Sequence, residues 1–160
     1  MSDSVAVVWD DSLLGYTMGG DHPMHPVRLE LTMRLAEALG VLASDRLQVV
    51  TPTPADVDLL TLVHDPAYLD AVKRAPADPG VGYGLGTPDN PIFEGMYDAS
   101  ALITGGTVLA AQMVHSGAVQ HAVNISGGLH HAMRDSASGF CIFNDIAVAI
   151  RWLLQQGVER

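Results

Sequence analysis

Basic residues are scarce in this sequence. Its 160 residues include 8 Lys and Arg against 18 Asp and Glu, which gives a formal net charge of −10 at pH 7. A chain this acidic has no general attraction for nucleic-acid phosphates or anionic lipids, so we expect it to bind neither nucleic acid nor membranes. The charge favours a cationic partner instead, such as a lysine-rich protein surface or a polyamine.

Cysteine is nearly absent as well. The single cysteine, Cys141, has no partner for a disulfide within the chain. The opening residues, Met-Ser-Asp-Ser, lack the basic and apolar segments that are typical of a secretory signal. Both observations favour a reducing, intracellular compartment, and we expect the protein in the cytoplasm.

The sequence also lacks a long uninterrupted hydrophobic run. Residues 99–133 contain no Asp, Glu, Lys or Arg, yet polar residues and glycines interrupt them throughout, which argues against a transmembrane helix. A buried helix followed by a buried strand fits this stretch better. With 48% hydrophobic and 16% charged residues, the chain has a soluble globular composition, and its length fits a single domain over residues 1–160.

Hydrophobic periodicity predicts two strands and several helices. Short apolar runs predict buried strands at 5–9 and 121–125. Helical spacing and capping signals predict helices at 26–40, from 53, from 65, at 92–117 and at 145–156. Loops rich in glycine, proline or histidine separate them at 16–26, 76–91 and 126–144. This order is typical of the α/β class with a parallel sheet, and the Gly105-Gly106 pair inside a helix predicts the close approach of another backbone.

Two adjacent histidines, His130 and His131, follow the second predicted strand. Open α/β sheets place ligands just beyond the carboxyl ends of their strands. Adjacent side chains on a regular strand face opposite ways, so the two imidazoles share one site only on an irregular turn, which Gly127-Gly128 permits. Such a pair can divide the work of general acid and base catalysis, although a pair alone is weak evidence.

The pair is accompanied by further motifs in a fixed order along almost the whole chain. They are Gly-Gly-Asp-His22-Pro-Met-His25-Pro-Val-Arg28, Val63-His64-Asp65-Pro-Ala-Tyr68, Gly86-Thr-Pro-Asp89-Asn-Pro, Glu94-Gly-Met-Tyr97, Ser126-Gly-Gly-Leu-His130-His131-Ala and Gly139-Phe140-Cys141-Ile-Phe-Asn144-Asp145. In this combination the sequence resembles the histone deacetylase superfamily, and especially its bacterial acetoin utilization (AcuC-type) branch. The resemblance implies the parallel-sheet, three-layer fold of arginases and deacetylases, of which this chain would be the N-terminal part.

The resemblance also implies roles for individual residues. His131 resembles the general base and acid of zinc-dependent deacetylation, and His130 resembles its electrostatic partner. Phe140 resembles a wall of the tunnel that holds the acetyl-lysine methylenes, and Gly139 offers backbone contact to the amide. Asp89 resembles an aspartate at the rim that accepts hydrogen bonds from the substrate backbone.

A second group of residues resembles the lining of an inner cavity, through which acetate leaves. These are Arg28, Leu129 and Cys141, although many relatives have an aromatic residue where this chain has Leu129. Taken singly, the candidate residues also have ordinary structural interpretations. These are turn residues for His22, His25 and Asp89, helix-entry packing for His64, a solvated helix position for Arg28, and core positions for Phe140 and Cys141.

The metal ligands that the resemblance implies are missing. The family holds Zn²⁺ with an Asp-x-His pair after the next strand and a later aspartate, and Asp-x-His occurs nowhere in this sequence. Zn²⁺ is therefore expected for the complete protein, with ligands outside this chain. We expect the isolated 160 residues to be an inactive, incomplete deacetylase domain.

Two functional hypotheses remain open at this point. The first is a zinc-dependent deacetylase whose substrate is an acetylated lysine protein or an acetylpolyamine. The alternative is a truncated, inactive deacetylase-like module that acts only by binding or self-association. An unpaired strand edge would favour a homo-oligomer in either case.

Overall fold

A parallel sheet lies at the centre of the structure, which is a computed structural model describing residues 4–159. Within these residues the sheet has the strands β1 (Val5–Val8), β2 (Leu47–Val50) and β3 (His121–Asn124), in the order β2-β1-β3. Both neighbours of β1 run parallel to it, and Val7 pairs with Val49 on one side and with Val123 on the other. The expected α/β class with a parallel sheet is confirmed.

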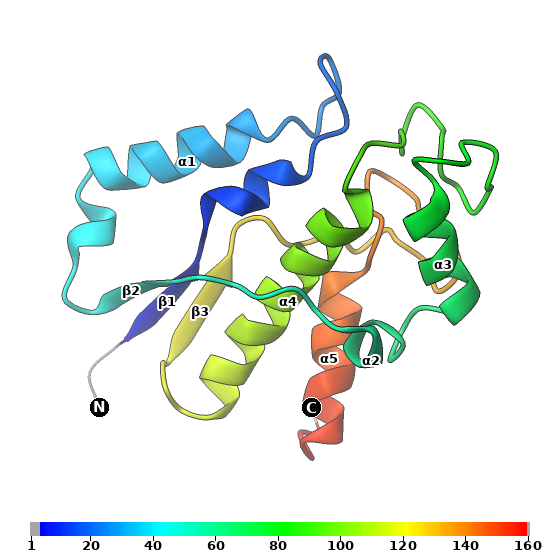
Figure 1. Ribbon diagram of the computed structural model, residues 1–160. Coiled ribbons are helices and arrows are strands. Elements are labelled where there is room, and N and C mark those ends of the chain that lie inside the picture. The colour runs from blue at the N-terminus through cyan, green and yellow to red at the C-terminus, as the bar shows by residue number, and fades with distance from the viewer. Residues whose placement is uncertain (1–3, 160) are drawn as a thin grey trace.

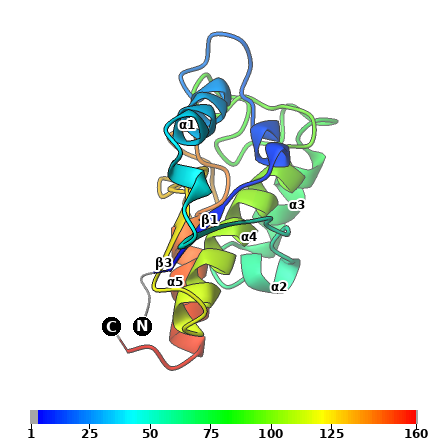
Figure 2. The same cartoon turned by 90° about the vertical axis from the view of Figure 1, so that its left-hand side faces the viewer.

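Helices cover both faces of this sheet. They are η1 (Asp11–Gly15), α1 (Val27–Ala38), η2 (Val41–Ala43), α2 (Val57–Leu60), α3 (Pro66–Arg74), α4 (Met96–His115) and α5 (Asp145–Gln155). Helix α4 packs against β1 and β3, α5 packs against α4, and α1 lies on the opposite side of the sheet (Figures 1 and 2). The arrangement confirms the three-layer α/β fold. No helix within residues 4–159 is long and apolar enough to cross a membrane.

The glycine pair in α4 lets a backbone segment approach closely, as predicted. A Cβ atom on Gly105 would collide with the carbonyl oxygen of Thr53 and would lie 2.7 Å from the amide nitrogen of Ala55. That same amide donates a hydrogen bond of 2.9 Å to the carbonyl oxygen of Ala101 in α4. The glycines therefore seat α4 directly on the segment that follows β2.

Three expectations about the elements were wrong. The helix expected from Thr53 begins at Val57, because the Asp56 carboxylate caps it by accepting a 2.8 Å bond from the Leu59 amide. Strand β2 was missed, since its four residues alternate too weakly to mark it. Strand β3 was expected to be buried, yet His121 and Val123 are exposed because only β1 pairs with it in the described residues.

Candidate active site

The two histidines lie on the irregular segment between β3 and α5, at the carboxyl end of the sheet. Their imidazole centroids are 4.3 Å apart, and the rings are tilted by 38°. Both residues are exposed. The expected loop over 126–144 is confirmed. Its irregular backbone brings the imidazole rings of His130 and His131 together, as a shared site requires.

The ring of His130 is held by its own backbone. Its Nδ1 lies 2.8 Å from the carbonyl oxygen of Gly128, and its amide nitrogen donates to that same oxygen at 2.9 Å. A carbonyl oxygen only accepts, so Nδ1 carries the hydrogen and donates. In the neutral ring, Nε2 is left as the free acceptor.

Gly139 lies directly against the ring of His131. A Cβ atom at Gly139 would be 2.9 Å from Cγ of His131, and the residue has a φ of +51°. Any side chain at position 139 would therefore displace the His131 ring. Phe140 follows with a φ of 69°, and its ring meets the ring of His22 edge-on at a centroid distance of 4.6 Å. The fold thus places the backbone of Gly139 against the His131 ring and the ring of Phe140 against the ring of His22.

Two buried tyrosines clamp the segment that carries Phe140. The Tyr16 hydroxyl donates to the Phe140 carbonyl at 2.7 Å and accepts from the Ile142 amide at 3.2 Å. The Tyr68 hydroxyl donates to the Ile142 carbonyl at 2.7 Å. Burial raises the pKa of both phenols, so they stay protonated donors at neutral pH.

The other candidate residues lie in different surroundings. Asp89 is exposed in the loop before α4, and its side chain makes no hydrogen bond or ion pair within residues 4–159. Arg28 is exposed and lines a cavity of about 140 Å³ with Tyr16 and Ser126. Leu129 and Cys141 are buried in the hydrophobic core, where burial raises the pKa of the Cys141 thiol.

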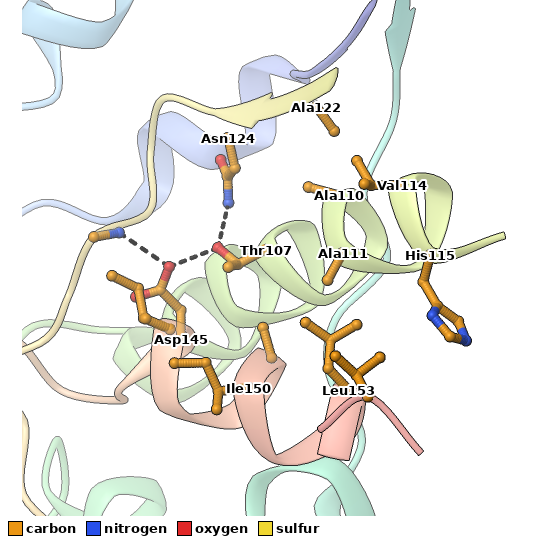
Figure 3. A pocket seen from close by; sticks show the side chains of 14 residues that line it. Thr107, Ala110, Ala111, Val114, His115, Ala122, Asn124, Asp145, Ile150 and Leu153 are labelled. Carbon is orange, nitrogen blue, oxygen red and sulfur yellow. Dashed lines mark hydrogen bonds between the residues drawn. The ribbon is translucent and has the colours of Figure 1, made fainter. Parts of the chain in front are cut away.

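Asp145 organises the histidine-bearing segment, a role that no local pattern in the sequence indicated. The side chain is fully buried. Its Oδ1 accepts from the Leu129 amide at 2.7 Å, and its Oδ2 accepts from the Gly128 amide at 3.0 Å and from the Thr107 hydroxyl at 2.6 Å. Asn124, at the end of β3, donates to the Thr107 hydroxyl oxygen at 3.0 Å (Figure 3). One carboxylate therefore ties β3, α4 and α5 to the residues just before His130.

Asn144 holds the same segment from its other side. Its Nδ2 donates to the carbonyl oxygens of His130 at 3.2 Å and Ala132 at 2.9 Å, while its Oδ1 caps α5 by accepting from the Ala147 amide at 3.0 Å. The position before a predicted helix could have signalled the cap. Nothing in the sequence signals the two bonds that lead back to the histidine segment.

His64 in turn fixes the backbone of Asn144. It is buried before α3, its Nε2 accepts from the Asn144 amide at 2.9 Å, and its Nδ1 lies 3.3 Å from the carbonyl oxygen of Arg134. This pattern fits only the neutral ring with its hydrogen on Nδ1. Burial lowers the pKa of His64 from its ordinary value of 6.5.

Acidification is therefore expected to destabilise the protein through His64. The pKa of His64 is lower in the folded chain than in the unfolded chain, so below about pH 6.5 the unfolded state binds more protons. The stabilisation is complete above that pH and is lost as the pH falls further. Urea unfolding between about pH 7.5 and pH 5, the range over which histidine titrates, should show a shallower decline in the free energy of unfolding for His64→Gln than for the unaltered chain.

The control for this measurement is the exposed His121. His121→Gln removes a histidine from an exposed position, and the pH slope of His64→Gln is compared with the slope of this variant as well as with that of the unaltered chain. Equal pH slopes in His64→Gln and the unaltered chain would contradict the assignment of a neutral, hydrogen-bonded His64.

No part of the described chain gathers a metal site. Within residues 4–159 there is no group of three or more His, Cys, Asp or Glu side chains that could hold a metal ion. The zinc ion that the resemblance implies does not fit the side chains described.

Comparison with known proteins places these features in context. A family model described as the histone deacetylase domain matches residues 22–160. The chain is 45% identical over 158 residues to the acetoin utilization protein AcuC of Bacillus subtilis (strain 168), covering 96% of this chain and 40% of that protein. It is 37% identical over 164 residues to AcuC of Staphylococcus aureus (strain MSSA476), with 99% and 42% covered.

A solved structure gives the same result for the fold. The crystal structure of an HDAC homolog from Aquifex aeolicus matches with a TM-score of 0.83 and 29% sequence identity, over 98% of this chain and 43% of that chain. The chain thus spans about 40% of the length of the curated relatives that it matches.

Proposed function

This chain belongs to the histone deacetylase domain family, and we propose that it supplies the histidine-bearing part of an active site that removes acetyl groups from lysine side chains. The observation that carries the proposal is the His130–His131 pair at the carboxyl end of β3, with ring centroids 4.3 Å apart. Buried Asp145 fixes the backbone immediately before that pair.

The reaction is the hydrolysis of an amide. Water adds to the acetyl carbonyl carbon, the bond from that carbon to the lysine nitrogen breaks, and acetate and a free lysine amine result. His131 takes the proton from the attacking water and delivers it to the departing amine nitrogen. His130, whose Nδ1 donates to the Gly128 carbonyl, presents Nε2 to the same site and stabilises the charge that develops there.

The neighbouring residues bind the substrate. The ring of Phe140 forms one wall of the channel for the lysine methylenes, and the missing side chain at Gly139 leaves room beside His131 for the amide. Asp89, exposed and unpaired in the described residues, accepts hydrogen bonds from the substrate backbone. The net charge of −10 suits an acetylated protein rich in lysine or an acetylpolyamine.

The remaining expectations concern the inner cavity and the compartment. Arg28 lines the small cavity beside Tyr16, which offers a cationic lining for a departing carboxylate. Leu129 and Cys141 shape the packed core behind the histidines. A free, buried Cys141 suits the cytoplasm.

The side chains of residues 4–159 do not form a site that could hold zinc. When bound, zinc would polarise the acetyl carbonyl and lower the pKa of water. We propose that the zinc ligands lie outside residues 4–159, because within those residues no group of His, Cys, Asp or Glu side chains could hold a metal ion.

A chimera tests this proposal. In it, the chain replaces the aligned 158 residues of the Bacillus subtilis relative, whose sequence is 45% identical there. The chimera should release acetate from an acetyl-lysine peptide, with the intact relative assayed in parallel. If the relative hydrolyses the peptide and a chimera lacking both His130 and His131 does so equally well, the proposal is wrong.

A further inference from the structure

Two histidines in the loop before α1 make the same local contact. Nδ1 of His22 accepts from the Met24 amide at 3.0 Å, and Nδ1 of His25 accepts from the Val27 amide at 3.1 Å. Both side chains are partly buried. The two histidines differ in one respect, because the ring of His22 also packs edge-on against the ring of Phe140. Turn formation alone therefore does not account for His22.

The bond from Met24 defines the state of the His22 ring. A nitrogen that accepts from an amide carries no hydrogen, so in the neutral ring the hydrogen lies on Nε2. This Nε2 is buried and has no hydrogen-bond partner within residues 4–159. Beyond its bond with Met24, the side chain of His22 therefore contacts its neighbours by packing.

The backbone of Phe140 is fixed without the help of His22. Its φ of 69° lies in the left-handed region, which residues other than glycine seldom adopt. The Tyr16 hydroxyl donates to the Phe140 carbonyl oxygen at 2.7 Å. These features set the point from which the side chain of Phe140 starts, but they do not select among its rotamers. The orientation of the Phe140 ring depends on what packs against it.

His22 supplies aromatic packing that favours one orientation. The two ring centroids are 4.6 Å apart, and the ring planes are inclined by 83°. This is the edge-to-face geometry that aromatic pairs prefer. No other aromatic ring within residues 4–159 packs against Phe140 in this way. The contact links the loop before α1 to the loop before α5.

We propose that His22 is a positioning residue that holds the Phe140 ring as the wall of the channel for the lysine methylenes. This inference rests on the proposed function, in which Phe140 forms that wall. Gly139 lies against the His131 ring, so the wall follows directly on the segment beside the proton-transferring group. When the ring leaves this orientation, the apparent affinity for the substrate falls with the fraction of chains that remain competent.

Asparagine variants of the two histidines test the proposal in the chimera with the Bacillus subtilis relative. Asparagine accepts from the amide two residues later, so His22→Asn and His25→Asn both keep the turn, but only His22→Asn removes the ring from Phe140. His22→Asn should raise KM for an acetyl-lysine peptide by about twofold to tenfold, the effect that one aromatic pair can have. Its kcat should not change, because no proton-transferring group is altered. His25→Asn should change neither constant.

A phenylalanine variant separates the ring contact from the turn. His22→Phe loses the acceptor for the Met24 amide but restores an aromatic ring beside Phe140. Its KM should therefore lie nearer to that of the unaltered chimera than the KM of His22→Asn does. A role in the turn alone would give the opposite order, because His22→Asn keeps the turn and His22→Phe does not.

The orientation of the ring is measured by NMR on the 160-residue chain, independently of activity. The chain has three phenylalanines, so labelling their rings gives three sets of signals. His22→Asn should shift the signals of Phe140 and leave those of Phe93 and Phe143, whose ring contacts are with other residues. His25→Asn should leave all three sets in place.

The two measurements separate a failure of this proposal from a failure of the proposed function. Phe140 signals that His22→Asn does not shift, or a KM that His22→Asn and His25→Asn change alike, would overturn the positioning role of His22. An unaltered chimera without deacetylase activity would contradict the proposed function instead, while the NMR signals would still decide whether His22 orients the ring. Should circular dichroism show that His22→Asn fails to fold, His22→Ala takes its place in both measurements.

Discussion

Replacing His131 with alanine in the chimera is expected to lower kcat by about 10²–10⁴-fold, the contribution typical of a positioned general acid and base. The imidazole lies beside Gly139, where no side chain separates it from the position proposed for the amide. Without this imidazole, no group takes the proton from the attacking water and no group delivers a proton to the departing amine. The measurement is the steady-state rate of acetate release from an acetyl-lysine peptide.

The neighbouring histidines provide the comparison. His130→Ala should cost less than His131→Ala, since His130 stabilises charge and does not carry the proton. His121→Ala, on the exposed face of β3, should leave kcat unchanged. The zinc content of the chimera should be the same in all three variants. Activity retained in His131→Ala would remove the proton-transfer role from that residue.

Replacing Asp145 with alanine is expected to lower the free energy of unfolding of the 160-residue chain by about 3–5 kcal/mol. Three donors would lose their acceptor: the amide of Leu129, whose bond is buried, and the amide of Gly128 and the hydroxyl of Thr107, whose bonds are partly buried. An unsatisfied buried donor costs about 1–3 kcal/mol. Urea unfolding monitored by circular dichroism measures the difference.

A matched aspartate separates this loop-anchoring role from a general helix effect. Asp98 lies in the first turn of α4 as Asp145 lies in the first turn of α5, but Asp98 is exposed. Asp98→Ala should cost less than about 1 kcal/mol, because a carboxylate near a helix N-terminus contributes about that much through the helix dipole. Similar losses for the two variants would show that the buried network does not anchor the histidine segment.

Local signals in the sequence predicted the parts of the fold that depend on neighbouring residues. Pro66 marked the start of α3, and Gly105-Gly106 marked a close backbone approach. Both signals are local, because a proline ring restricts the backbone at its own position and a missing Cβ leaves space at its own position. The position of the histidine pair beyond a strand followed in the same way. These features need no knowledge of distant contacts.

Contacts between residues far apart in the chain could not be predicted from the sequence. The buried role of Asp145 depends on Thr107, 38 residues earlier, and on two backbone amides whose direction only the folded loop defines. The bond from Asn144 to His64 spans 80 residues. Strand β2 and the exposed face of β3 were missed or misjudged for the same reason, since burial depends on which strands become neighbours.

The measurement that tests the central claim most directly is made on the 160-residue chain alone. We claim that it carries the proton-transferring histidines of a deacetylase site while the metal ligands lie outside residues 4–159. After extensive dialysis, metal analysis should therefore find far less than one zinc ion per chain, and an acetyl-lysine peptide should not be hydrolysed. Stoichiometric zinc together with turnover by the isolated chain would contradict the account.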